Sequence, residues 1–478
     1  MTAVSAYQIQ RSHHEPPEII DEFMALHFKV RAAIINGTWS APQGRVVTRN
    51  VDIFKISPQL LIENVVQTVP DINLHLGDYQ DEDLHVAGEG FDKVNLVTGM
   101  KGGGKSHITK GIISESLKLN MSSVVFDINN EYDNLTPSAV VLRPGSSGNF
   151  KFRLDRMDVE TFLALVKRLS PFPPATELAA NAEIPLLIQQ RIQARLIPDI
   201  PFLRGAVNQV FPGNDNNQVV SNMRSAYSRS LENVEKYNLI MTEQEAQDED
   251  AAVRNGQPAQ MRSLITAFHN TFNHGAQLIV FRLGGLRSTL QRAILTLVLD
   301  HLKKLCDRQA AAATRQNPPA FPIYPTVFFE EAHMYMDEQR IEELVPLIRH
   351  IGINVFFITN TPGALPESVF RLVDNLIMTR MFSRKDIDRI VDCGLTDKET
   401  IYGFARNLKD RHALFLSAKE GATKNFPLVF RVRDFELPKS GQTRSQWRAM
   451  REHSESQQNA TSTSKDASSN TTQDQASS

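Results

Sequence analysis

The feature that most constrains this chain is a glycine-rich segment flanked by two patterns of different period. Val94–Thr98 is a short run of strand type, and Ser106–Leu119 places Ile108 and Ile112 on one face of a helix. Ser123–Ile128 then supplies a second short apolar run, typical of a strand buried on both faces. Strand, glycine loop, helix and strand in this order predict the start of a parallel α/β sheet.

Further apolar runs of strand length follow and predict that the same sheet is large. They are Gln277–Leu283, Thr326–Phe329, Asn354–Thr359, Asn375–Met381, Ala413–Ser417 and Leu428–Val432. A helical segment, Asp337–His350, separates two of these runs. Residues from about 152 to 272 are mostly helical in pattern and predict a helical insertion, in which the acidic stretch Glu243–Asp250 is expected to form a solvated face or loop. We therefore predict one large α/β domain over residues 90–438.

The two ends of the chain have a different character. Residues 1–89 combine a helical pattern near Asp21–Ile35 with strand-like pieces such as Arg45–Ile53, which predicts a small N-terminal domain. From Ser454 onward the apolar residues are alanines among polar ones. Such a segment buries too little surface to offset its ordering entropy, so residues 439–478 are predicted to form a disordered polar tail.

Composition excludes several classes of protein. Lys and Arg number 52 against 54 Asp and Glu, so a nucleic-acid-binding surface would have to be local. Two cysteines, Cys306 and Cys393, rule out a disulfide framework and a cysteine-based zinc motif, which fits a reducing cytoplasm. An apolar run of the ~20 residues needed for a membrane span is missing, and the N-terminus has no apolar signal core. We expect a cytoplasmic protein without a membrane partner.

The glycine-rich segment matches G-x-x-x-x-G-K-[ST] in full: Gly99, Met100, Lys101, Gly102, Gly103, Gly104, Lys105 and Ser106. Glycines let the backbone approach phosphates with its N–H groups pointing inward, and the helix that begins there adds its positive end. Lys105 is predicted to reach the β- and γ-phosphates, and Ser106 to hold Mg²⁺. Together with the sheet, this motif predicts a RecA-like P-loop NTPase core that binds ATP and Mg²⁺.

Hydrolysis needs a second acidic site at the end of another strand. Thr326–Phe329 ends in two adjacent carboxylates, Glu330 and Glu331. The first is predicted to join the Mg²⁺ shell, and the second to orient the attacking water.

Two further strand ends carry polar side chains. Asn360 follows Asn354–Thr359, where it contacts the γ-phosphate or the water, or else stabilises a turn. Asp127–Asp133, which includes Glu131, follows the second strand and forms a ligand site at the carboxyl edge of the sheet, or else a helix cap or turn.

Taken in order, five segments resemble the HerA–FtsK superfamily of ring-forming P-loop ATPases, and the HerA branch in particular. They are GMKGGGKS, VVFDINNEYD, VFFEEAH, RHIGINVFFITNTP and DIDRI, and the resemblance covers about Val94 to Asp434. It implies that Asp127, Glu131 and Tyr132 match the family's Asp…Glu-Tyr motif. The acidic pair of the family falls on Glu330 and Glu331, and its usual Gln at the later strand end is replaced by Asn360.

Arg349 matches the family's basic helix end before Gly352, a position that faces the nucleotide of the neighbouring subunit. A surface ion pair with Glu342 or Glu343 is the alternative role for this arginine. The chain departs from the family in three ways. Glu330 stands where Asp is usual, the arginine-rich run is reduced to Arg349 and His350, and the N-terminal region does not match the family's small β-barrel clearly, so its fold stays open.

The resemblance implies a homohexameric ring that hydrolyses ATP at subunit interfaces and moves double-stranded DNA through its pore, often with a nuclease or another effector. The alternatives are an ATPase regulator of an effector complex, for example in defence against foreign DNA, and a slowly hydrolysing nucleotide-binding scaffold. A small-molecule kinase is disfavoured because it would be shorter. Lys151, Arg153 and Arg156 are candidates for contact with DNA, but a solvated basic face is the favoured interpretation.

Overall fold

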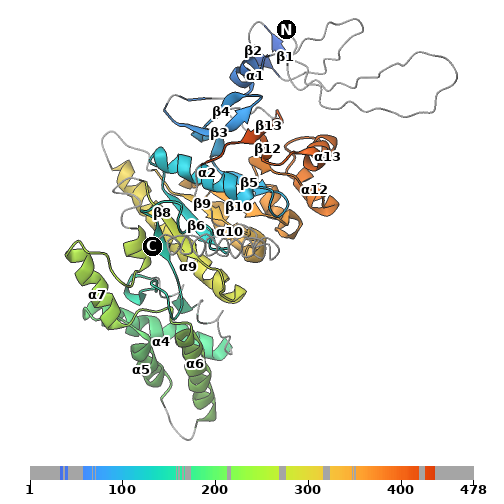
Figure 1. Ribbon diagram of the computed structural model, residues 1–478. Helices are drawn as coiled ribbons and strands as arrows, with labels where there is room; N and C mark the ends of the chain where they lie inside the picture. The colour runs from blue at the N-terminus through green and yellow to red at the C-terminus, as the bar shows by residue number, and fades with distance from the viewer. Residues whose placement is uncertain are drawn as a thin grey trace, which may run out of the picture. The chain divides into compact units, whose positions relative to one another are not determined.

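The computed structural model describes residues 33–35, 38–40 and 57–435, with gaps at 67, 70, most of 158–173, 213–216, 269–275, 316–322, 347, 349–350 and 419–425. Figure 1 shows the arrangement of its elements. Two short strands, β1 (Ala33–Ile35) and β2 (Thr38–Ser40), pair with each other. The predicted helix near Asp21–Ile35 is therefore wrong at its last three residues. Its other residues and the strand-like run Arg45–Ile53 lie outside the described part.

One sheet of eleven strands organises the described chain, in the order β4-β3-β13-β12-β11-β5-β10-β9-β6-β8-β7. The strands from β11 to β7 pair in parallel, whereas β12, β13, β3 and β4 continue the sheet in antiparallel pairing. Their bounds are β3 (Asn73–Tyr79), β4 (Glu82–Ala87), β5 (Val94–Thr98), β6 (Ser123–Asp127), β7 (Val140–Leu142), β8 (Leu278–Arg282), β9 (Thr326–Phe329), β10 (Val355–Thr359), β11 (Asn375–Met378), β12 (His412–Ser417) and β13 (Leu428–Val432).

Helices cover both faces of this sheet, and each face has its own core. Alternate residues of β5 show the division, because Leu96 belongs to one core and Val97 to the other. On the Val97 face lie α1 (Pro58–Val65) and α2 (Lys105–Lys118). The helices on the Leu96 face are α9 (Ser288–Thr314), α10 (Glu338–Pro346), α11 (Glu367–Phe370), α12 (Arg384–Val391) and α13 (Lys398–Asn407).

Among the described residues, the predicted helical insertion contains these helices between β7 and β8: α4 (Pro174–Gln193), α5 (Ile200–Val210), α6 (Gln218–Lys236), α7 (Glu243–Arg254) and α8 (Leu264–Phe268). Helices α4, α5 and α6 pack side by side (Figure 1). Their buried residues join the core on the Leu96 face, so the insertion shares that core. The acidic stretch Glu243–Asp250 forms the first two turns of α7, where a Thr242 capping box starts the helix, so it is not a loop. Its residue Asp248 is exposed, as in a solvated face, whereas Glu249 is buried.

A row of phenylalanines runs across four neighbouring parallel strands on the Leu96 face. Phe357, Phe329, Phe126 and Phe281 are paired in register on β10, β9, β6 and β8. Their rings stack with centroids 5.3–5.4 Å apart. All four are buried, so this row fixes the relative positions of the strands whose carboxyl ends carry the site described below.

The N-terminal part of the sheet was not predicted. β3 and β4 form an antiparallel hairpin that pairs with β13, so residues 73–87 continue the large sheet. The division of the chain at residue 89 stays a prediction, and the predicted tail, residues 439–478, lies outside the described residues.

Candidate nucleotide-binding site

The glycine-rich loop joins β5 to α2, as predicted. Gly104 has φ 96°, a left-handed conformation that glycine adopts without strain, and α2 begins at the next residue. A Cβ placed on Gly102 or Gly104 would meet no atom within 4 Å, so the loop faces open space there. Open space beside a glycine-lined helix N-terminus is what a chain of phosphates requires.

Lys105 lies at the base of this loop and is 8% exposed. Its Nζ donates hydrogen bonds to the carbonyl oxygens of Gly99 and Met100, both at 3.1 Å. Burial lowers the pKa of Lys105, and the charges of Glu331, Glu330 and Glu131 oppose that effect. The ammonium group is thus held where it can meet an anion, with carboxylates close enough to stabilise its charge.

Glu330 is the more deeply buried member of the acidic pair, at 2% exposure. The backbone N–H and the side-chain amide of Asn129 donate to its two carboxylate oxygens, at 3.3 and 3.1 Å. Burial, with Asp127 beside it, raises the pKa of Glu330 well above its usual range. β6 and β9 therefore bring Asp127 and Glu330 together, because parallel neighbours end at the same edge of the sheet.

Glu331 follows Glu330 directly after β9 and has a φ of 47°, in the left-handed region. Asn360 Nδ2 donates to Glu331 Oε1 at 3.2 Å, and Glu331 Oε2 lies 3.4 Å from His333 Nδ1. The same His333 nitrogen lies 2.9 Å from the hydroxyl of Thr359, the last residue of β10. The structure thus places Asn360 against the second carboxylate.

Glu131 approaches the start of α2 from the loop after β6. Its carboxylate accepts a hydrogen bond from the hydroxyl of Ser106 and lies 3.8 Å from Lys110 Nζ. Burial raises the pKa of Glu131, while the charge of Lys110 and the Ser106 hydroxyl act in the opposite direction. The ammonium of Lys110 also lies over the ring of Tyr132, 5.4 Å from its centroid. The predicted ligand edge is therefore assembled from β5, β6, β9 and β10.

The loop also rests on the end of β11, a contact that the motif did not indicate. A Cβ on Gly99 would come within 1.8 Å of the Thr379 hydroxyl, so the loop backbone and Thr379 are in close approach. The Met100 N–H donates to the carbonyl oxygen of Arg380 at 2.9 Å. Thr379 lies inside the predicted run Asn375–Met381, of which only Asn375–Met378 forms β11, and nothing in its local sequence connects it with Gly99.

The basic residues proposed for DNA contact are placed otherwise. Lys151 and Arg153 are 4% and 5% exposed, and both pair with acids of α7. Lys151 bonds Glu245 at 2.6 Å, and Arg153 lies between Glu249 and Asp250. These two are therefore neither a solvated face nor free for DNA; they fix α7 to the chain before the insertion. Arg156 is more exposed and pairs with Asp155 at 3.3 Å.

Arg349 lies outside the described residues, so its predicted position at a neighbouring subunit's nucleotide stays a prediction. Of the other predicted site residues, Lys105, Ser106, Glu131, Glu330, Glu331 and Asn360 belong to one connected cluster. Of the remaining loop residues, Gly102 faces open space, and the Gly103 N–H closes the turn by donating to Met100 O at 3.0 Å. A glycine cradle, a buried lysine and a facing carboxylate group fit a nucleotide with its divalent cation.

Solved structures share the fold of this chain. VirB4 of Thermoanaerobacter pseudethanolicus superposes with a TM-score of 0.53 at 12% identity, covering 77% of this chain and 98% of VirB4. The bacterial conjugative coupling protein TrwBΔN70 gives a TM-score of 0.49 at 12% identity, covering 82% and 95%. TrwB in complex with ADP and Mg²⁺ gives 0.47 at 13%, covering 81% and 94%. The likeness to VirB4 supports the RecA-like P-loop fold.

No curated protein matches the chain. Among the described residues, no helix combines the length and apolar character needed to cross a membrane. Two family models do match: the central domain of helicase HerA over residues 89–302, and the helicase HerA-like C-terminal domain over residues 322–390. Together they span more than half of the chain and include the glycine loop, the acidic pair and Asn360, and the chain therefore belongs to the HerA-like ATPases of the HerA–FtsK superfamily.

Proposed function

We propose that this protein is an ATP-hydrolysing motor that assembles as a homohexameric ring and translocates or unwinds double-stranded DNA. The observation that carries the proposal is the cluster around Lys105, a buried lysine at the end of the glycine loop. Three glutamates after the ends of β6 and β9 stabilise the charge of this lysine: Glu131, Glu330 and Glu331. Such convergence of a phosphate loop with carboxylates is the arrangement that phosphoryl transfer to water requires. The family membership supports the motor character.

The residues have distinct roles in this proposal. Lys105 and backbone N–H groups of the glycine loop, other than those of Met100 and Gly103, would hold the phosphates, while Ser106 and Glu330 would hold Mg²⁺. When bound, Mg²⁺ neutralises charge that develops on the transferred phosphoryl group. Glu331 orients the attacking water, and Asn360 holds the Glu331 carboxylate in the orientation that this task needs. Glu131 accepts a hydrogen bond from the Ser106 hydroxyl and so fixes its orientation.

Slow hydrolysis is the second candidate, and Glu330 favours it. Its longer side chain is already bonded to Asn129 at both oxygens, and its raised pKa favours the protonated form. A protonated carboxyl is a poor ligand for Mg²⁺. In this case the protein is a nucleotide-binding scaffold or an ATPase regulator of an effector complex. A nuclease or other effector is the partner in the motor proposal, whereas an effector complex in defence against foreign DNA is the setting of the regulator or scaffold.

DNA contact through phosphates requires no sequence-specific groups, so the near-neutral total charge is compatible with it. Binding by phosphate contacts should weaken steeply as salt rises and should show little sequence preference. The residues that make it are not Lys151 or Arg153, because both are buried in ion pairs. Free thiols at Cys306 and Cys393 fit a reducing, cytoplasmic compartment.

The test is native mass spectrometry of the purified chain together with ATP hydrolysis, measured with and without duplex DNA at low and high salt. The motor proposal predicts a hexamer whose ATPase rate rises with duplex DNA at low salt and loses that rise at high salt. A monomer, or a ring that binds ATP without DNA-stimulated turnover, would instead support the scaffold or regulator.

A further inference from the structure

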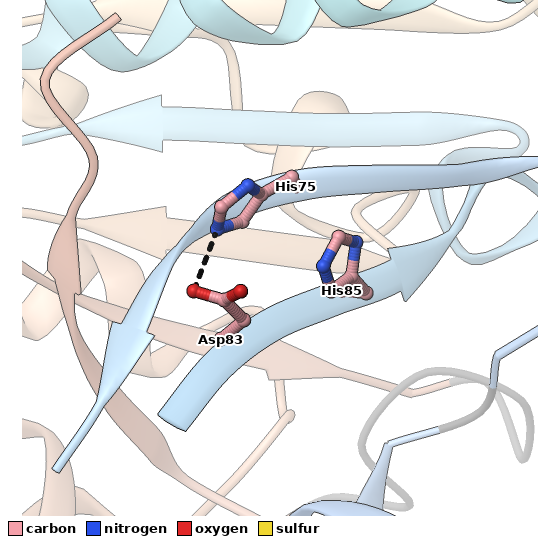
Figure 2. A group of neighbouring side chains, drawn as sticks. All are labelled: His75, Asp83 and His85. Atoms are coloured by element: carbon pink, nitrogen blue, oxygen red, sulfur yellow. Dashed lines mark ion pairs between the residues drawn. The ribbon is translucent and has the colours of Figure 1, made fainter. Parts of the chain in front are cut away.

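A histidine pair and a carboxylate meet on the β3–β4 hairpin and do not belong to the cluster around Lys105. Figure 2 shows His75 on β3, with Asp83 and His85 on β4. His75 and His85 are directly opposite in the strand register, and Asp83 lies two residues before His85 on the same face. One ligand atom from each of the three lies within 4.8 Å of the others.

Three observations suggest that this cluster is more than a surface ion pair. The Nε2 atom of His75 is buried and makes no hydrogen bond within the described residues, although Asp83 Oδ1 lies 3.5 Å away. A β-bulge between His75 and Gly77 shifts the register beside the cluster. Bulges commonly re-aim side chains at functional sites. The hairpin adds further negative charge at Asp78 on β3, Asp81 in the turn and Glu82 on β4.

We propose that His75, Asp83 and His85 form a binding site for a zinc ion, with a fourth coordination position open to water. Two imidazoles and one carboxylate form a common ligand set for zinc, with bonds of about 2.0–2.2 Å. Tetrahedral ligand atoms are then about 3.4 Å apart, closer than the 4.8 Å spread of the present atoms. Side-chain rotation can close this gap, because opposite β-carbons in such a pair lie only about 4.5–5.5 Å apart.

The stacked arrangement of the His75 and His85 rings must change for the three ligand atoms to come closer together. The rings now stack with centroids 4.5 Å apart and planes 25° from parallel, so their nitrogen lone pairs run side by side. Rotation of the His85 imidazole about its Cβ–Cγ bond brings one of its nitrogens toward Asp83, whose Oδ1 already lies 3.5 Å from His75 Nε2. The Asp83 side chain is 68% exposed and can follow.

Arg433 opposes binding and therefore provides a diagnostic test. Its Nη1 lies 2.9 Å from His75 Nδ1 and, as an obligate donor, gives a hydrogen bond to that nitrogen. Zinc on Nε2 would place a proton on Nδ1, so the two donors would face each other. Arg433 also lies 3.7 Å from Glu115, a carboxylate that can retain it when it moves. Removing Arg433 should accordingly strengthen zinc binding, which a purely structural His–Asp contact gives no reason to expect.

The experiment is zinc titration by calorimetry of the full chain, stripped with a chelator and kept in excess Mg²⁺ to occupy magnesium sites. Adjacent His13 and His14 can also chelate zinc, so a His13→Ala/His14→Ala protein serves as the background. We expect one zinc per chain. His85→Ala and Asp83→Asn should each weaken binding at least about tenfold, in line with losses seen even for outer-shell partners. Arg433→Met should tighten it.

His412→Ala, which alters a histidine on β12, is the matched control and should leave zinc binding unchanged. Thermal melting without zinc checks that each variant folds. Absence of a stoichiometric zinc site in the background protein would overturn the proposal. Binding that is unaffected by both His85→Ala and Asp83→Asn would also overturn it, because zinc would then lie elsewhere on the chain. Weaker binding in Arg433→Met would contradict the competition argued for that residue.

Discussion

Replacing Asn360 by alanine tests how the site orients Glu331. Asn360 Nδ2 donates one hydrogen bond, at 3.2 Å, to a carboxylate oxygen of Glu331, and its own Oδ1 accepts from Thr361 Oγ1 at 2.7 Å. A hydrogen bond to a charged group contributes about 1.5–3 kcal/mol. If that energy holds Glu331 in its working orientation, its loss lowers kcat by about tenfold to 150-fold. Nucleotide affinity should stay unchanged, because the side chain of Asn360 bonds Glu331 and Thr361, which lie outside the glycine loop.

Steady-state ATP hydrolysis separates kcat from KM, and a fluorescent nucleotide measures affinity directly. Asn360→Gln, whose longer amide still reaches the carboxylate, should restore part of the rate. Asn407→Ala removes an exposed amide on α13 that bonds the Gly403 carbonyl oxygen, and it is the matched control with no expected effect.

A double-mutant cycle with Glu331→Gln decides whether Asn360 acts through Glu331. If it does, the double variant should be no slower than Glu331→Gln alone, within about 0.3–0.5 kcal/mol. Fully additive losses would refute the reasoning and would mean that Asn360 contacts the phosphate or the water by itself. Unchanged kcat in Asn360→Ala would refute it too.

Three further predictions concern charge, packing and assembly. Because burial raises the pKa of Glu330, the stability of the wild type falls as pH rises from the usual carboxyl range toward that raised pKa. Glu330→Gln removes this loss, so its melting temperature should exceed that of the wild type by more at about pH 8 than at about pH 5. Phe126→Ala removes a ring from the middle of the phenylalanine row and should lower the free energy of unfolding, measured in urea, by about 3–5 kcal/mol. A decrease below about 1 kcal/mol would contradict the structural role of the row. Arg349→Ala mixed with Lys105→Ala should recover ATPase above the sum of the two separate variants if the arginine acts across subunits; mixed rings, confirmed by mass, without such recovery would contradict that role.

The parallel core of the sheet could be predicted because its strands are buried on both faces. Thr326–Phe329 and Val94–Thr98 have the predicted bounds, since unbroken apolar or neutral runs flanked by polar residues leave little choice of limits. β7 was missed because it has three residues, and β3 because His75, Gly77 and Asp78 interrupt the alternation expected of a strand.

The site residues that could be predicted from the sequence are those that belong to contiguous motifs. The glycine loop and the acidic pair were found because each motif lies within a few residues, and parallel topology then brings their strand ends together. Contacts between distant segments were not predictable in this way. Thr379 on the chain after β11 contacts Gly99 in the loop after β5. Arg153 forms ion pairs with Glu249 and Asp250 of α7, which begins about ninety residues later in the chain.

The most direct test of the central claim is ATP hydrolysis by wild type and by Lys105→Ala, with Mg²⁺ present and subunit assembly verified by mass. Lys118→Ala removes an exposed lysine at the other end of α2 and is the matched control. We predict that Lys105→Ala abolishes turnover and weakens ATP binding while keeping its melting temperature close to that of wild type, and that Lys118→Ala behaves as wild type. Turnover that is unchanged in Lys105→Ala would contradict the assignment of the glycine loop as the site of hydrolysis.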